Sequence, residues 1–301
     1  MGTAGARGAA ARVLPALTVL LLLLAAGALA GCGDPDEVGP PVALPPAGAR
    51  LDYQLGGDHD PVPGEGPPGG VGVVVRDWHD GRPLPGAYSV CYVNAFQTQP
   101  DGDGTRPDER SAWPAHLLLG GLGEDPGWPG ELLVDISTAA RRAEAAAWLA
   151  PVLQTCADRG FDAVELDNLD SWTRFDGTPE QGRVPFGRDD AVAHAALLAD
   201  RAHALGLAVA QKNTPQLTRY EARDVVGFDL AVAEECGRYR ECGAYTALYG
   251  GAVLVVEYDD EGMARACDEV GTEVPVVRRD VGLSVPTSGS YVRRWCDDVS
   301  P

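Results

Sequence analysis

Residues Gly160 to Asp170 read GFDAVELDNLD, which is a glycine, a short apolar run and a cluster of acids at the end of that run. The same order recurs in three later segments, 206–213, 227–235 and 250–258. Alanine-rich stretches with helical spacing, 138–157 and 189–205, precede the first two of these runs, and Pro151 is expected to kink or divide the first helix. Strands that alternate with helices predict a parallel sheet.

Four earlier apolar segments, 53–55, 71–75, 88–93 and 132–134, bring the expected strands to eight. Eight parallel strands joined by helices close a (β/α)8 barrel of the TIM type, and residues 51–301 have the length of one such domain, about 250 residues. A doubly wound open sheet is disfavoured because no Gly-x-Gly-x-x-Gly opens a helix after the first strand. Two smaller domains would also fit the length, but no second linker separates them.

The N-terminal 31 residues have the features of a bacterial lipoprotein signal peptide. Arg7 and Arg12 precede an apolar run, 13–30, and Leu-Ala-Gly stands directly before Cys32. Residues 32–50 are rich in Gly and Pro and predict a flexible tether. We therefore expect a protein that is lipidated at Cys32 on the extracellular face of the cell membrane, or secreted. A retained transmembrane anchor is the alternative, but it would leave the motif before Cys32 unexplained.

The chain carries a formal charge of -20, which disfavours nucleic acid and anionic lipid as partners. Solubility outside the cell explains this acidity, and a cationic substrate is the second interpretation. Apart from Cys32 the chain has six cysteines, an even number that suits disulfides in an exported protein. A metal site at Cys236 and Cys242 is the alternative for these two, but no histidine lies near them in sequence. The expected disulfides are Cys236 with Cys242, Cys267 with Cys296, and Cys91 with Cys156.

Polar residues gather where the expected strands end, and the active site of a (β/α) barrel lies at that end. Lys212 is notable among them because it is the only lysine beside 23 arginines, the two types together numbering 24. A compact ammonium there indicates a role that a guanidinium would not fill. The residues that end the expected strands are Asp77, Asn94, Asp135, Asp167, Asp170, Lys212, Asn213, Glu234, Glu235, Glu257 and Tyr258.

An acidic rim of this kind suits the hydrolysis of glycosidic bonds, which needs one protonated and one ionised carboxyl group. The chain has no Gly-x-Ser-x-Gly elbow, no phosphate-binding loop and no His-Glu-x-x-His motif. A hard-cation site made by Glu165, Asp167 and Asp170 is the alternative, but few neutral oxygen ligands lie nearby in sequence. We expect neither a metal nor a cofactor.

Several of these segments resemble glycoside hydrolase family 114, the endo-α-1,4-polygalactosaminidases. GFDAVELDNLD at 160–170 is similar to the family's GFD(G/A)VEPDNVD, and GLAVAQKN at 206–213 to its GLxVGLKN. FDLAVAEEC at 228–236, followed by YREC, is similar to FDFAVNEQC and YxEC. Upstream, GWPGE at 127–131 matches a family motif, so the resemblance covers residues from about 51 to 258.

The resemblance implies a barrel enzyme in which Asp167 is the nucleophile and Glu234 the general acid/base. It implies a polysaccharide substrate with α-linkages, of which a cationic galactosaminoglycan is one form. Rebuilt segments at 76–78, 94–100 and 175–188 leave the sugar open. A carbohydrate-binding surface lipoprotein without activity is the alternative, followed by a structural envelope lipoprotein. The expected substrate-contacting or orienting residues are Asp77, Tyr92, Asp170, Lys212, Asn213, Glu257 and Tyr258.

The motif before Cys32 predicts that the mature protein lacks residues 1–31 and carries an acylated Cys32. Mass spectrometry of the protein from native membranes should find a lipid-modified N-terminal peptide beginning at this cysteine. An unmodified thiol at Cys32 would contradict the prediction.

Overall fold

A computed structural model describes residues 42–60 and 70–298. The expected signal peptide and Cys32 lie outside these residues, so both stay predictions. Within the described ranges, none of the helices combines the length and the apolar character that a membrane span requires.

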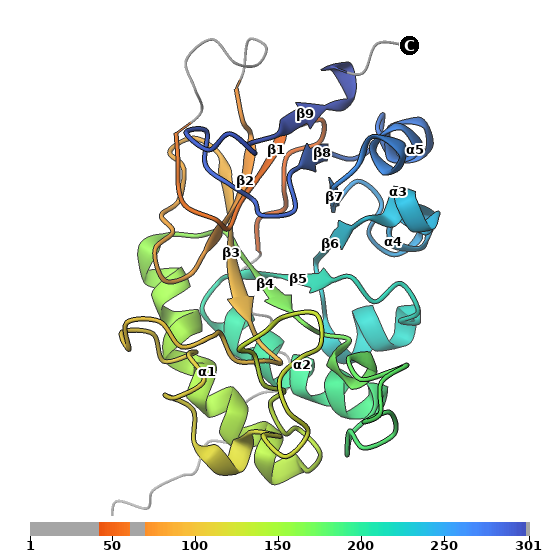
Figure 1. Cartoon of the computed structure of the whole chain (residues 1–301). Helices are drawn as coiled ribbons and strands as arrows, with labels where there is room; N and C mark the ends of the chain where they lie inside the picture. The colour runs from red at the N-terminus through yellow and green to blue at the C-terminus, as the bar shows by residue number, and fades with distance from the viewer. Residues whose placement is uncertain (1–41, 61–69, 299–301) are drawn as a thin grey trace, which may run out of the picture. The chain divides into compact units, whose positions relative to one another are not determined.

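The described residues build a nine-stranded sheet whose strands follow one another in chain order (Figure 1). The first eight strands pair in parallel and the ninth pairs antiparallel to the eighth. This nearly closed sheet with helices around it confirms the TIM-type barrel. The strands are β1 (Leu51–Gln54), β2 (Val73–Asp77), β3 (Tyr88–Asn94), β4 (Ala163–Asp167), β5 (Ala208–Lys212), β6 (Leu230–Glu234), β7 (Val253–Glu257), β8 (Val276–Arg279) and β9 (Arg293–Trp295).

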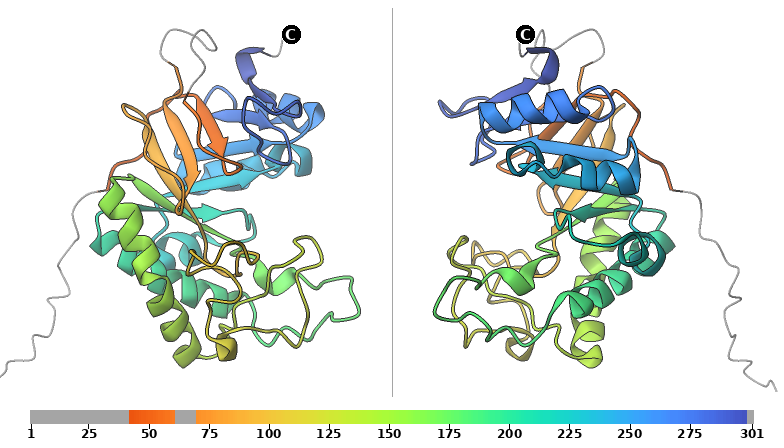
Figure 2. Two further views of the ribbon diagram at one scale, coloured as in Figure 1. Left: turned by 60° about the vertical axis from the view of Figure 1, so that its left-hand side comes forward. Right: turned by 90° about the vertical axis from the view of Figure 1, so that its right-hand side faces the viewer.

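Both expected helices form, and α1 and α2 lie side by side against the sheet (Figure 2). The Thr138 side chain accepts a hydrogen bond at the start of α1, and Gly160, with φ of 86°, ends it. The helix continues through Pro151, so the expected division does not occur. The helices are α1 (Ala139–Arg159), α2 (Arg188–Ala204), α3 (Cys236–Tyr239), α4 (Cys242–Tyr249), α5 (Asp260–Val270), the π-helix η3 (Tyr220–Val226) and the 3-10 turns η1 (Ala115–Leu117), η2 (Ser171–Thr173) and η4 (Cys296–Asp298).

One expected barrel strand is wrong. Residues 132–134 lie in the segment between β3 and α1, where Leu133 and Val134 form isolated antiparallel bridges with Gln97 and Leu118. The eighth parallel strand is instead β8, which begins directly after Pro275 and ends on two arginines. A run of three apolar residues fits an isolated bridge in a loop as well as it fits a short strand. In β8 the two arginines interrupt the apolar run by which a buried strand is recognised in sequence.

Side chains alternate between two hydrophobic layers along each strand, as the pleat of a strand requires. In β4, Val164 and Leu166 pack with the helices in the outer cluster, whereas Ala163 packs in the inner cluster inside the barrel. Glu165 and Asp167 share the parity of Ala163 and therefore face inward. This alternation decides which residue of each strand can reach the centre of the barrel.

Side chains, rather than a backbone ladder, join β1 to the last strands. Among the described residues the ladder runs from β1 to β9 without pairing β1 to β8. Asp52 lies between Arg279 of β8, at 2.9 Å, and Arg293 of β9, at 2.7 Å, with all three side chains buried. Trp295 Nε1 also donates to the Leu51 carbonyl oxygen at 2.7 Å. We call this contact between β1 and the β8–β9 pair the seam.

The seam yields a prediction on stability. Asp52→Asn should lower the free energy of unfolding by about 3–5 kcal/mol, because it leaves buried arginine charge without its carboxylate. Burial raises the pKa of Asp52, but the His59 hydrogen bond and the two arginines lower it well below its usual range. The stabilisation is thus present above pH ~4, the unfolded pKa, and is lost as the pH falls further. Denaturant unfolding at pH 7 measures the effect.

The matched control is Asp297→Asn, which removes the exposed partner of Arg50 near the same end of the barrel. Exposed ion pairs contribute about 0–1 kcal/mol, so this variant should unfold almost like the wild type. Equal losses in the two variants would contradict the importance of the seam.

Candidate active site

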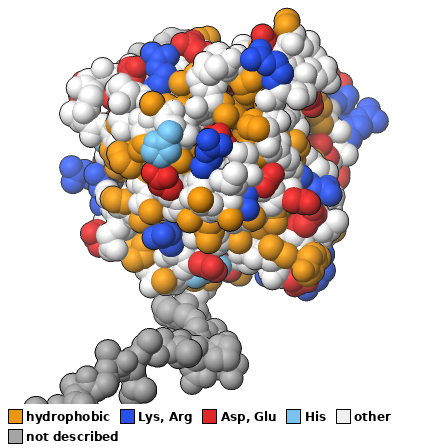
Figure 3. All heavy atoms as spheres, turned by 90° about the horizontal axis from the view of Figure 1, so that it is seen from below, with side chains coloured by type: hydrophobic (Ala, Val, Ile, Leu, Met, Phe, Trp, Pro, Cys, Tyr) orange, Lys and Arg blue, Asp and Glu red, His pale blue; other side chains and the backbone are white. Residues whose placement is uncertain are grey.

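A cavity of about 920 Å³ opens at the carboxyl ends of the strands. Acidic residues outnumber basic ones in its lining by seven to three, whereas on the face in Figure 3 acidic, basic and hydrophobic side chains are interspersed. The cavity is therefore a local concentration of negative charge. Its acidic lining residues are Asp77, Glu131, Asp167, Asp170, Glu234, Glu235 and Glu241, and its basic ones are Arg174, Lys212 and Arg238.

The two carboxylates expected to be catalytic meet at one ammonium in this cavity. Lys212 Nζ lies 3.1 Å from Asp167 Oδ1 and 3.3 Å from Glu234 Oε2. These two oxygens cannot be farther apart than the sum of the distances, about 6.4 Å. The structure thus brings Asp167 of β4 and Glu234 of β6 together on either side of Lys212 of β5.

Asp167 is held in its ionised form. Burial alone would raise the pKa of Asp167, but the charge of Lys212 and hydrogen bonds from Tyr92 and the Asn168 backbone outweigh it and hold this pKa below its usual range. The Tyr92 hydroxyl donates to Asp167 Oδ2 at 2.5 Å. A carboxylate that stays ionised and points into a cavity is suited to act as a nucleophile.

Glu234 is fixed by neighbours on both sides. Asn213 Nδ2 donates to Glu234 Oε2 at 3.1 Å, and Asn213 Oδ1 accepts from the Glu234 backbone N–H at 2.8 Å. The Tyr258 hydroxyl donates to Glu234 Oε1. Tyr92, Lys212, Asn213 and Tyr258 therefore contact one or both of the two carboxylates.

The residue after each of these three strand ends has a left-handed backbone. The φ angles are 63° for Asn168, 47° for Asn213 and 55° for Glu235. Such conformations cost roughly 1–3 kcal/mol for a residue other than glycine and concentrate at functional sites. Here each one turns the chain sharply after Asp167, Lys212 or Glu234.

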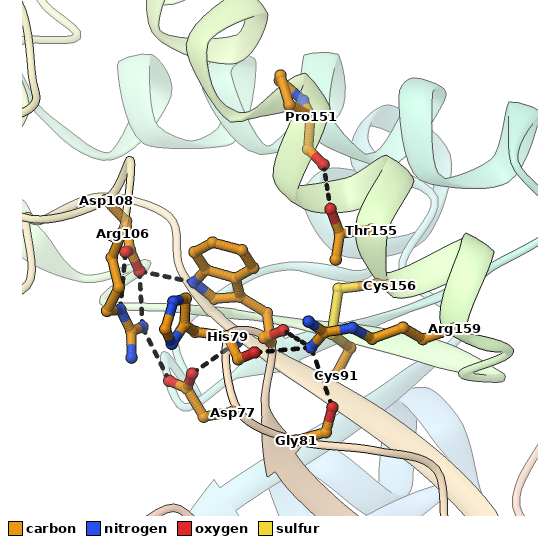
Figure 4. Close-up of a disulfide and its surroundings, with 11 residues drawn as sticks. Asp77, His79, Gly81, Cys91, Arg106, Asp108, Pro151, Thr155, Cys156 and Arg159 are labelled. Carbon is orange, nitrogen blue, oxygen red and sulfur yellow. Dashed lines mark hydrogen bonds and ion pairs between the residues drawn. A yellow bond between two sulfur atoms is a disulfide. The ribbon is translucent and has the colours of Figure 1, made fainter. Parts of the chain in front are cut away.

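Asp77 and Asp170 also line the cavity, and each has an arginine partner. Arg106 contacts Asp77 at 3.0 Å and Asp108 at 2.9 Å, as Figure 4 shows beside the Cys91–Cys156 disulfide. Arg174 contacts Asp170 at 3.0 Å. Burial raises the pKa of both cavity carboxyls, and their arginines offset part of that effect. The structure therefore places both expected substrate contacts on the cavity wall.

Glu257 is the expected substrate contact that the structure places elsewhere. It has the same parity as Val255 of the outer layer, it is fully buried, and it is not among the lining residues. Glu257 Oε1 accepts from the Gly237 backbone N–H at 2.7 Å, and a side chain at Gly262 would come within 2.2 Å of Oε2. Glu257 thus supports the turn after β6 from behind the barrel wall.

The three expected disulfides form: Cys91–Cys156, Cys236–Cys242 and Cys267–Cys296. The second closes the turn that follows Glu234 and carries Glu235, Arg238 and Glu241 to the cavity. The sulfurs of Cys236 and Cys242 also lie within 4.8 Å of a Glu257 oxygen, but they are bonded to each other and are not free as metal ligands.

Some cavity residues lie outside the set that the sequence predicts. Tyr53 of β1 accepts a hydrogen bond from Lys212. Alternation along β1 could have indicated that the Tyr53 side chain faces the inside of the barrel. Trp128 and Glu131 come from the long segment between β3 and α1, and Tyr239 follows the cysteine turn. Burial raises the pKa of Glu131 to about 8. The motif GWPGE was the only sequence signal for Trp128 and Glu131, because loop residues lack a periodicity that fixes their direction.

A barrel of parallel strands with an acid-lined cavity at their carboxyl ends defines a (β/α)-barrel enzyme. The sequence model of glycoside-hydrolase family GH114 matches residues 35–301. The chain belongs to this family and is a glycoside hydrolase. No curated protein matches the chain.

Solved structures show the same fold. Ega3 from Aspergillus fumigatus, in complex with galactosamine, aligns with a TM-score of 0.64 and 21% identity over 82% of this chain and 97% of that chain. The glycoside hydrolase domain of PelA from Pseudomonas aeruginosa aligns with a TM-score of 0.52 and 14% identity over 82% of this chain and 98% of that chain.

The cysteine turn after β6 yields a prediction on activity. The double variant Cys236→Ser, Cys242→Ser should lose about 2 kcal/mol of stability, as loop closure predicts. It should also lose catalytic turnover, because the turn positions the residues that follow Glu234. Thermal unfolding and steady-state kinetics on a cleaved glycan measure the two effects.

The matched control is Cys267→Ser, Cys296→Ser, which removes the disulfide between α5 and η4. This variant should lose stability but keep kcat and KM, since neither half-cystine lines the cavity. If the first variant kept wild-type turnover as well, the Cys236–Cys242 disulfide would have no role in the site.

Proposed function

We propose that this protein is a retaining glycoside hydrolase that cleaves α-linked, galactosamine-containing polysaccharide, with Asp167 as nucleophile and Glu234 as acid/base. The observation that carries the proposal is the contact of both carboxylates with Lys212 Nζ, at 3.1 and 3.3 Å, inside the acidic cavity. Two carboxyl groups on opposite sides of a sugar ring are what glycosidic hydrolysis requires.

The distance between the pair favours retention of configuration. Retaining enzymes hold their carboxyl groups roughly 5–5.5 Å apart, whereas inverting enzymes leave roughly 6.5–9.5 Å for a water molecule. The near oxygens of Asp167 and Glu234 are at most about 6.4 Å apart, a limit that includes the retaining separation and ends at the lower edge of the inverting range.

In the first step, an Asp167 oxygen attacks the anomeric carbon while Glu234 gives its proton to the glycosidic oxygen, which leaves with the rest of the chain. The sugar is then bound to Asp167 as an ester. In the second step, Glu234 takes a proton from water, the resulting hydroxide attacks the same carbon, and the bond to Asp167 breaks. Tyr92 and Lys212 stabilise the ionised Asp167 before attack and after release.

The charge of the cavity supports an amino sugar as substrate. The ammonium groups of deacetylated galactosamine residues are attracted by the acids of the cavity wall, and Trp128 offers an exposed ring, 55% accessible, on which a sugar can stack. Ega3, which shares the fold, is in complex with galactosamine. Attraction between exposed charges is screened by salt, so KM for such a polymer should rise with ionic strength.

We further propose that the enzyme acts outside the cell, held at the membrane by a lipid on Cys32. The motif before Cys32 supports this location. The three disulfides of the barrel also suit an oxidising compartment.

The proposed function is tested by incubating the protein with partially deacetylated galactosamine polymers and with a panel of other α-glycans. New reducing ends should appear with the galactosamine polymers, and NMR should show the α-anomer as the first product. Asp167→Asn and Glu234→Gln should each lower kcat by about 10² or more, because each removes an ionisable group while keeping its size.

Asp268→Asn, at an exposed position on α5, is the matched control and should keep full activity. Sugar binding without new reducing ends would instead support the carbohydrate-binding lipoprotein. Full activity of both carboxylate variants would show that other residues are catalytic, and a β-anomer would contradict retention.

A further inference from the structure

Beneath the two carboxylates lies a third, which the mechanism above does not use. Glu165 precedes Asp167 by two residues in β4, faces the inside of the barrel and is fully buried. Its Oε2 atom has no hydrogen-bond partner among the described residues. A buried acid at such a position needs an explanation, because desolvation of a charge is costly unless the charge is paired.

Glu165 is the closest carboxylate to the ammonium that holds the pair. Lys212 Nζ lies 2.7 Å from Glu165 Oε1, compared with 3.1 Å for Asp167 and 3.3 Å for Glu234. The Tyr53 hydroxyl donates to the same Glu165 oxygen at 2.7 Å and accepts from Lys212 Nζ at 2.9 Å. Glu165 and Tyr53 therefore fix the place of the ammonium.

The ammonium has fewer hydrogens than it has neighbours. A lysine side chain offers three N–H donors and one positive charge. Four oxygens, from Tyr53, Glu165, Asp167 and Glu234, lie within 3.3 Å of Lys212 Nζ. A contact made to Glu165 is thus taken from the other two carboxylates, and the single charge is divided among three acids.

We propose that Glu165 is a positioning residue that anchors Lys212 and, by its own charge, controls how much of the lysine's positive charge reaches Asp167 and Glu234. This inference rests on the proposed function. When Glu165 is ionised, it competes with Asp167 and Glu234 for the positive charge of Lys212. When Glu165 is protonated, that charge stabilises only Asp167 and Glu234. The buried acid therefore sets the working pH of the site without touching substrate.

The surroundings of Glu165 agree with a change of charge near neutral pH. Burial raises the pKa of Glu165 to about 7, although Lys212 opposes this rise. Burial also raises the pKa values of the tyrosines around it well above their usual value, so these stay neutral, and the carboxylates keep Lys212 charged. The titratable groups that face Glu165 are Tyr53 of β1, Tyr92 of β3, Asp167 of β4, Lys212 of β5, Glu234 of β6 and Tyr258, which directly follows β7.

The experiment uses the fact that Lys212 is the only lysine of the chain. Protein labelled with 13Cε-lysine gives one side-chain NMR signal, whose shift reports the charges around Lys212. In the wild type this signal should move in a step near pH 7, the pKa of Glu165. In Glu165→Gln the step should be absent, because the amide does not titrate.

Glu257→Gln is the matched control. Burial raises the pKa of Glu257 to about 7 as well, but this acid faces the outside of the barrel, so its removal should keep the Lys212 step. Tyr53→Phe is the second test, and it covers the case that Glu165→Gln does not fold. Loss of the hydroxyl that donates to Glu165 should move the step to higher pH. A step that is unchanged in both Glu165→Gln and Tyr53→Phe would overturn the proposal.

Kinetics provides the test of the link to the reaction. Glu165→Gln removes an anion beside the proton donor, so the alkaline limb of kcat against pH should move to lower pH by about half a unit or more. KM should change by less than about twofold, since Glu165 does not line the cavity. An unchanged limb in an active variant would overturn the inference, whereas a wild type that cleaves no glycan would overturn the proposed function itself, together with the role of Glu165 in it.

Discussion

One ammonium among three carboxylates is the constraint on which the rest of the structure depends. Lys212 reaches Glu165, Asp167 and Glu234 only if β4, β5 and β6 keep their register, because a slip of one residue would turn each side chain to the opposite face. Charges buried in this way are tolerated only when they are paired closely. The parallel ladders, the left-handed residues at the strand ends, the tyrosines of β1 and β3 and the tyrosine after β7 all support this pairing.

The fold and the centre of the site could be predicted from sequence because both follow from regular patterns. Glycine, apolar run and polar end mark β4 to β7, and alternation within those strands places Asp167, Lys212, Glu234 and Tyr258 inside the barrel. The same alternation excludes Glu257, which shares the parity of Val253 and Val255. Glu257 was expected to contact substrate only because it ends a strand, although its side chain faces the outer layer.

Other parts of the site have no regular pattern to reveal them. Trp128 and Glu131 reach the cavity through the long segment after β3, whose path depends on isolated bridges and on contacts between residues distant in sequence. The expected strand at 132–134 was wrong for a related reason. Whether a short apolar run joins a barrel is decided by its neighbours in space. Arg279 of β8, for example, is buried against its partner Asp52 of β1.

The seam has a consequence for how the barrel moves. Asp52 and Tyr53 are consecutive residues of β1: the first binds Arg279 of β8 and Arg293 of β9, and the second contacts Lys212 at the centre. No backbone ladder joins β1 to β8 among the described residues. If β1 moved away from β8 there, Tyr53 would move with Asp52 and lose its hydrogen bond to Lys212. The seam and the charges around Lys212 are thus coupled through two adjacent residues of β1, so a displacement at the seam would also change the surroundings of the carboxylates that Lys212 contacts.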